Sequence, residues 1–117
     1  DRWEFKASMK NKHYWFGAVS FENKIYVVGG RSSEIYHPQE DQWAEIPHPN
    51  QCNGGRSLVV FKGKLMVIGG RIGEPNECKG IPTVQHYDFK NRVWKSVQDM
   101  NIARCLHSAA VLSFQQL

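Results

Sequence analysis

The sequence predicts an all-β fold of repeated four-stranded antiparallel sheets. The first observation is a repeat: Trp3 and Trp43, like the glycine pairs at 29–30 and 69–70, stand 40 residues apart. The second is that short apolar runs alternate with turn residues, which is typical of strands. The third is that small residues gather in the first run of each unit, as at Gly17. Together they favour compact repeating sheets over helices.

Each unit is expected to hold four short strands. In the first unit they are residues 16–21, 24–28, 35–36 and 42–46, and in the second 57–61, 64–68, 84–87 and 93–97. The first two strands of each unit meet at a two-residue turn, Glu22-Asn23 or Lys62-Gly63, because Asn or Gly at the second position accepts a positive φ. These strands are almost continuously apolar, which suits burial on both faces, whereas the fourth alternates like an exposed outer edge.

The glycines and the aromatic residues predict further features of the backbone and of the packing between units. The paired glycines should supply positive φ and close backbone approach at the end of the second strand. Small residues in the first strands fit sheets that converge on an axis. The aromatic residues of the repeat are expected to pack between units: Tyr36, Tyr87, Trp3, Trp15, Trp43 and Trp94.

The combined pattern resembles the kelch repeat. It runs from Gly-Gly through a Tyr to a Trp seven residues further on, at Tyr36 and Trp43 and again at Tyr87 and Trp94. The step between these tryptophans is 51, because 11 extra residues follow Gly70. The resemblance implies a partial kelch β-propeller of about two and a half blades, of the kind found in adaptors that join a BTB domain to kelch repeats.

This reading divides the chain into five segments. They are an outer strand of a preceding blade with its loop (1–15), a blade (16–46), an interblade loop (47–55), a blade with a long loop at 71–82 (56–97), and a loop with the inner strand of a further blade (98–117). The terminal strands are expected at 3–7 and 106–112. Because propellers have 4–8 blades, we expect a piece of a longer protein. Its open blade faces would need a partner or self-association.

Recognition is expected in the loops. In kelch-like adaptors, the loops after the second strand and those between blades share one rim that binds short peptides. By that resemblance the partner-binding residues are two arginines after Gly-Gly, two arginines at the inner strands, and two neutral donors: Arg31, Arg71, Arg56, Arg104, Ser33 and Asn53. Arginines suit bidentate capture of carboxylates, so an acidic peptide is the expected partner. Solvated arginines and interblade salt bridges are the alternatives, and 71–82 is either an inert insertion or a specificity element.

The charge and the cysteines narrow the possible partners, metal sites and cellular locations of the protein. The net charge of +4 is dispersed, so no nucleic-acid partner is expected, and no apolar run reaches the roughly 18 residues of a membrane span. Cys52, Cys78 and Cys105 form no disulfide framework and no paired zinc spacing, so no metal is expected. This cysteine usage favours a reducing compartment, the cytosol or nucleus, and of these we expect a cytoplasmic location. Each cysteine has a nearby basic or histidine residue, so thiol reactivity is left open.

Three functions follow from the resemblance. The first is the substrate-recognition region of a cullin-type ubiquitin ligase adaptor, with the cullin bound through domains outside this chain. The second is an actin-binding kelch scaffold. The third, a galactose-oxidase-like enzyme fragment, is disfavoured because the five histidines show no ligand spacing. We therefore expect neither enzymatic activity nor a cofactor.

Overall fold

The computed structural model describes residues 1–13, 15–73 and 79–112, and strands are its only regular elements. They are β1 (Gly17–Phe21), β2 (Lys24–Val28), β3 (Ser33–His37), β4 (Gln42–Ile46), β5 (Ser57–Phe61), β6 (Lys64–Ile68), β7 (Arg71–Ile72), β8 (Lys79–Gly80), β9 (Val84–Asp88) and β10 (Val93–Ser96). Among these residues no helix is long and apolar enough to cross a membrane. The all-β prediction is confirmed.

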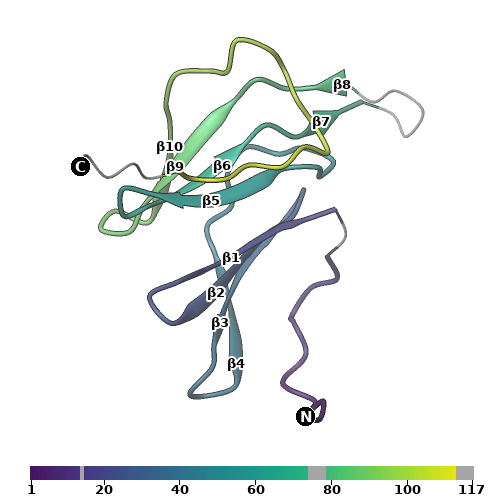
Figure 1. The fold of residues 1–117 in the computed structure, drawn as a ribbon, viewed down its shortest axis with the longest axis vertical. Coiled ribbons are helices and arrows are strands. Elements are labelled where there is room, and N and C mark those ends of the chain that lie inside the picture. The colour runs from purple at the N-terminus through teal and green to yellow at the C-terminus, as the bar shows by residue number, and fades with distance from the viewer. Residues whose placement is uncertain (14, 74–78, 113–117) are drawn as a thin grey trace.

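The strands form two four-stranded antiparallel sheets, ordered β1-β2-β3-β4 and β5-β6-β9-β10 (Figure 1). Each sheet is a meander in chain order, as predicted. Both hairpin turns adopt positive φ at their two central residues: 50° and 61° at Glu22 and Asn23, 51° and 71° at Lys62 and Gly63. This conformation matches the right-handed twist of the flanking strands. The long loop contributes a two-stranded ribbon, β7 with β8, which the sequence did not predict.

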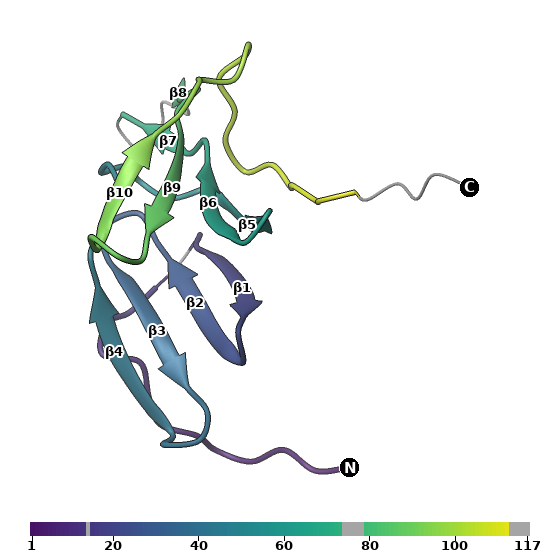
Figure 2. The same ribbon diagram turned by 90° about the vertical axis from the view of Figure 1, so that its left-hand side faces the viewer.

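The two sheets pack face to face and spread like a fan from their inner strands, β1 and β5 (Figure 2). The buried core between them comprises Tyr26, Val28, Ile35, Leu58, Leu65, Val67 and Tyr87. At the narrow edge, a Cβ added to Gly17 would lie 2.9 Å from Leu58 Cβ. Small inner-strand residues are therefore required where the sheets converge, as expected for blades of a propeller.

Each sheet also binds the segment that leads into it, through the same pair of contacts. Trp43 Nε1 donates to Ala7 O at 2.9 Å, and Trp94 Nε1 donates to Pro47 O at 2.7 Å. The Trp rings pack at a tilt against Tyr36 and Tyr87, with centroid distances of 4.9 and 5.1 Å. We call residues 7–13 the arm. It lies on the first blade as residues 47–53 lie on the second.

A chain of hydrogen bonds links Trp15, Gly55 and Leu106, the first two of which lie just before the inner strands β1 and β5. Gly55 N donates to Trp15 O at 2.8 Å, and Leu106 N donates to Gly55 O at 2.9 Å. These three residues are equivalent in the repeat, and all three have positive φ: 52°, 75° and 52°. The left-handed conformation is therefore a property of this repeat position, although only one of the three residues is glycine.

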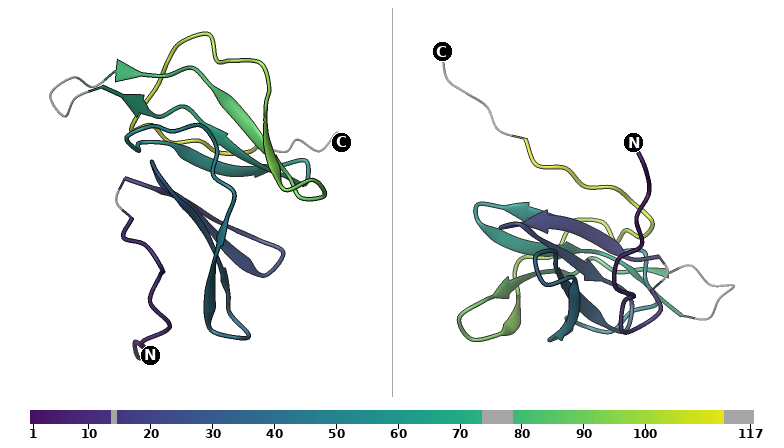
Figure 3. Two further views of the ribbon diagram at one scale, coloured as in Figure 1. Left: turned by 180° about the vertical axis from the view of Figure 1, so that it is seen from behind. Right: turned by 90° about the horizontal axis from the view of Figure 1, so that it is seen from below.

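The predicted terminal strands do not form within this chain. Residues 3–7 and 106–112 are not strands, because the described chain offers them no further blade with which to form a ladder. The first residues and residues 106–112 extend past the sheets on the side of the inner strands (Figure 3). Trp3 is 100% exposed and Trp15 is 51% exposed, so these two tryptophans do not pack between blades as predicted.

The glycine pairs meet the expectation in part. Gly69 and Gly70 have φ of 68° and 126°, as predicted, but Gly29 and Gly30 do not enter the left-handed region. At Gly30 the reason for glycine is space, since an added Cβ would lie 2.6 Å from Cys52 O. The first glycine pair is therefore required only because neighbouring segments of the chain approach it closely.

Candidate functional site

A pocket of about 640 Å³ lies at one end of the sheets, where loops of both blades meet. The residues that line it come from the arm and its continuation, the loop after β2, the linker between blades and the start of the long loop. They are Lys12, His13, Trp15, Gly29, Gly30, Arg31, Ser32, Cys52, Asn53, Arg71 and Gly73. Three of them are permanent cations, and none of the described lining residues is acidic. The pocket therefore favours an anionic occupant.

Arg71 is the most enclosed of these cations. Only 9% of the residue is exposed, and its guanidinium lies over the Trp15 ring, 4.2 Å from the centroid. Its backbone is fixed from both sides, because Arg71 N donates to Gly54 O and Arg71 O accepts from Asn53 N. The position of this cation is therefore set by both the ring and the main chain.

The wall opposite is held by a buried carboxylate that the sequence did not single out. Glu34 of β3 is 0% exposed, and it accepts hydrogen bonds from Lys10 N at 2.7 Å and Asn11 N at 3.2 Å. Its third partner is His13 Nε2, at 2.5 Å, whose side chain is also buried. These contacts fix the arm where Lys12 and His13 reach the pocket.

Two of the predicted partner-binding residues, Ser33 and Arg56, are buried, and each bonds to other parts of the chain. Ser33 is 1% exposed, and its hydroxyl donates to His48 Nδ1 at 2.7 Å while His48 Nε2 donates to Gly30 O. Arg56 is 4% exposed, and its Nε donates to Cys52 Sγ at 2.9 Å. Both side chains are used to join loops, because each is enclosed by the backbone that follows β4.

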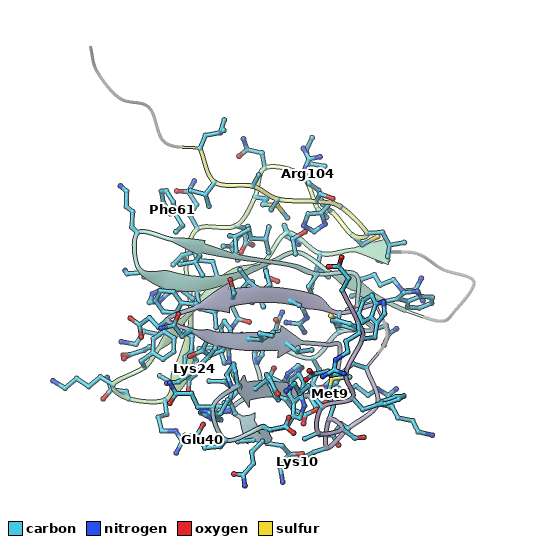
Figure 4. The ribbon with its side chains drawn as sticks, turned by 60° about the horizontal axis from the view of Figure 1, so that its bottom comes forward. Met9, Lys10, Lys24, Glu40, Phe61 and Arg104 are labelled. Atoms are coloured by element: carbon cyan, nitrogen blue, oxygen red, sulfur yellow. The ribbon has the colours of Figure 1, made fainter. Side chains whose placement is uncertain are left out.

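The other four predicted residues divide between the pocket and the surface. Arg31 and Arg71 line the pocket with Asn53, whose Nδ2 donates to Gly73 O. Arg104 is exposed and lies on the opposite side of the sheets from Lys10 of the arm (Figure 4). The structure thus brings three of the six together.

Burial sets the protonation of His48. It lowers the pKa of this imidazole, and the nearby Arg56 cation acts in the same direction, against the hydrogen bond to Gly30 O. Neutral His48 suits its two bonds, since one ring nitrogen donates and the other accepts. His48 is therefore a structural link behind the pocket.

Two further predictions concern metal binding and the reactivity of the thiols. Across residues 1–13, 15–73 and 79–112, no three His, Cys, Asp or Glu side chains gather as metal ligands. Cys52 is buried and Cys105 is partly buried, both as free thiols. Cys78 and the centre of the long loop lie outside the described residues, so those predictions stay open.

Two curated relatives that match this chain are named for kelch repeats. An F-box/kelch-repeat protein of Arabidopsis thaliana is 30% identical over 111 residues, which cover 87% of this chain and 26% of that protein. Kelch repeat and BTB domain-containing protein 8 of Rattus norvegicus is 30% identical over 106 residues, covering 78% of this chain and 18% of that protein. The chain thus spans about a quarter or less of these relatives.

The fold itself matches a solved structure, that of YjhT, with a TM-score of 0.77 and 18% identity over 92% of this chain and 34% of the other. The sheets are consecutive blades of a β-propeller. The profile of the Kelch motif matches residues 16–50 and 52–101. The chain belongs to the kelch-repeat family, and its repeats serve protein interaction.

Proposed function

We propose that this region is the substrate-recognition part of a cullin-type ubiquitin ligase adaptor that works in the cytoplasm. A relative named for a BTB domain beside kelch repeats supports this reading. The cullin would bind through such a domain, outside the residues considered, while the blades bind the protein to be modified.

The observation that carries the proposal is the cationic pocket between the two blades. Lys12, Arg31 and Arg71 line it, without an acidic residue among its described neighbours. Guanidinium groups bind carboxylates through paired hydrogen bonds, which are stronger than neutral ones. The partner we propose is therefore a peptide segment rich in Asp or Glu.

Charge reversal tests the assignment. In the full-length protein, Arg31→Glu together with Arg71→Glu should abolish capture of acidic partners from cells, measured by affinity purification and mass spectrometry. Cullin recovery should not change, because it depends on another domain. Arg104→Glu is the matched control, since this arginine is exposed and outside the pocket.

Two results would contradict the proposal. Partner capture that is unchanged by the double reversal would remove the pocket from recognition. Absence of any cullin from the wild-type purification would reject the adaptor role, and cosedimentation with actin filaments would then favour the scaffold alternative.

A further inference from the structure

We propose that Asn53 is a site of spontaneous chemical modification, at which the side-chain amide is converted through a succinimide ring into isoaspartate or aspartate. The inference goes beyond the proposed function and does not depend on it. Asn53 is the only asparagine of the sequence that precedes a glycine, whereas Asn50, for example, precedes Gln51. A following glycine leaves the backbone nitrogen that must attack without an adjacent side chain.

The reaction joins neighbouring atoms of the chain. Gly54 N gives its proton to a hydroxide ion and forms a bond with Asn53 Cγ, and the side-chain nitrogen takes a proton from water and leaves as ammonia. Water then opens the succinimide ring. Addition at the side-chain carbonyl gives aspartate, and addition at the main-chain carbonyl gives isoaspartate, in which the main chain is one carbon longer. The co-reactant is water alone.

The first argument concerns the nitrogen that attacks. Gly54 N donates to Cys52 Sγ at 3.3 Å, and sulfur is a weak acceptor. Gly30 leaves room beside the same nitrogen, because a Cβ at that position would lie 2.7 Å from it. Both of these neighbours line the pocket, so the nitrogen lies directly behind the pocket wall. Its proton is therefore weakly held and close to solvent.

The second argument is the freedom of the chain around the reacting atoms. Gly54 and Gly55 have φ of 99° and 75°, so two consecutive residues have no Cβ to restrict their rotation. The Asn53 side chain donates from Nδ2 to Gly73 O at an exposed site. Exposed hydrogen bonds open at small cost because water replaces them. The amide carbon is therefore free to turn toward Gly54 N.

The third argument is the charge of the pocket that Asn53 lines. Lys12, Arg31 and Arg71 line the same pocket. A positive potential raises the local concentration of hydroxide and stabilises the negative charge that develops on the amide oxygen when the ring closes. This effect requires the field of the cations and no direct contact with the product.

The modification has a structural consequence, because Asn53 lies where the linker is tied to the long loop. Asn53 N donates to Arg71 O at 2.7 Å, and Arg71 N donates to Gly54 O at 3.0 Å. Isoaspartate lengthens the main chain between these two bonds, and both products lose the donor to Gly73 O. We therefore expect the modification to loosen β7 from the linker.

The test is peptide mapping of the full-length protein after prolonged incubation at neutral pH in water labelled with heavy oxygen. Conversion during the incubation takes up a labelled oxygen atom, whereas conversion during digestion does not. Trypsin releases residues 32–56 as one peptide, which holds both Asn53 and Asn50. Asn50 is a matched reference, because its N and Nδ2 are bonded to Gln85 and Thr83. We expect Asn53 to be converted roughly tenfold faster than Asn50.

An enzyme specific for the product gives a second readout. Protein isoaspartate methyltransferase transfers a methyl group from S-adenosylmethionine to the isoaspartyl carboxylate. Methylation of the wild-type protein should rise with the time of incubation. Asn53→Gln keeps the amide but would need a larger ring, so this variant should lose most of the rise.

Hydrogen exchange followed by mass spectrometry measures the structural consequence. After incubation, the amides of β7 should exchange faster in the converted fraction. Freshly prepared Asn53→Asp is the matched variant, because it loses the donor to Gly73 O and adds the charge but keeps the length of the main chain. Its β7 amides should exchange less rapidly than those of the isoaspartyl protein.

Several outcomes would overturn the inference. They are conversion of Asn53 no faster than that of Asn50, a product with aspartate but without isoaspartate, and methylation that is unchanged in Asn53→Gln. Unchanged exchange at β7 in the converted protein would reject the structural consequence. These measurements need no partner, so their failure is distinguishable from failure of the charge-reversal test of the proposed function.

Discussion

The two blades share one plan but differ in how the third strand holds the incoming segment. In the first blade Glu34 accepts from Lys10 N, and in the second its counterpart Gln85 accepts from Asn50 N at 3.0 Å. In both blades the acceptor is a side-chain oxygen atom of the third strand. Only the first blade adds a charge and a buried histidine, His13.

This difference shows which parts of a repeat are architectural. The hydrogen bond to the incoming backbone is met equally by a carboxylate or an amide, so it sets the blade geometry. The charge is an addition specific to the blade, and here it fixes the arm that forms one wall of the pocket. The first two predictions below separate these two contributions, and the others compare further contacts of the two blades.

The largest effect is expected from Glu34→Ala. It leaves three part-buried donors without their acceptor, including the His13 ring, so the free energy of unfolding should fall by about 3 kcal/mol. Gln85→Ala, which removes one acceptor at a half-buried site, should cost about 1 kcal/mol. Urea unfolding of both variants measures the difference.

Glu34→Gln sharpens the same comparison, because it gives the first blade the residue type of the second. It should cost less than Glu34→Ala, since the amide oxygen still accepts from the arm. Equal losses for Glu34→Ala and Gln85→Ala would show that the charge adds nothing.

A smaller effect is expected at the outer strands. Trp94→Phe keeps the aromatic stack on Tyr87 but loses the bond to Pro47 O, and it should cost about 1 kcal/mol. Trp43→Phe should cost less, because its bond to Ala7 O is exposed to water. Thermal unfolding of the pair checks the order, and a reversed order would mean that the arm is the better-held segment.

The smallest effect concerns pH, and it involves His48, in the linker that leads into the second blade. Burial lowers the pKa of His48, so the folded protein binds this proton less readily than the unfolded chain. Stability from neutral His48 is complete above the unfolded pKa of about 6.5 and is lost as pH falls through that value. His107, whose pKa burial also lowers, acts in the same direction.

His48→Gln should therefore flatten the rise in stability between about pH 5 and 7 without removing it. The measurement is the urea midpoint across that range. The position equivalent to His48 in the arm is Ser8, which cannot titrate there. An unchanged slope in the variant would assign the pH dependence to other groups.

Strand positions and turns were accessible from the sequence because they depend on local pattern. Apolar runs, Asn23 and Gly63 each specify their conformation within a few residues, and the structure confirms them. The predicted terminal strands do not form here, because their pairing depends on a neighbouring blade and not on local pattern.

The site was harder to predict, because residue type does not show what a side chain touches. Arg56 and Arg71 look alike in sequence, yet one is bonded to Cys52 and the other faces a pocket. The 40-residue offset that relates Lys10 to Asn50 held a usable signal for the contacts at Glu34 and Gln85. Nothing in the pattern indicated the left-handed backbone of Trp15, which depends on contact with the next repeat.

The hydrogen bonds between equivalent positions of successive repeats have a consequence for the number of repeats that a stable assembly holds. Gly55 both receives and gives a bond along the series Trp15, Gly55, Leu106. An open arc of this kind always holds one bond fewer than its members, whereas a closed circle holds as many bonds as members. Joining the last repeat to the first would therefore gain a link that no intermediate length possesses, and this favours circular completion over indefinite stacking.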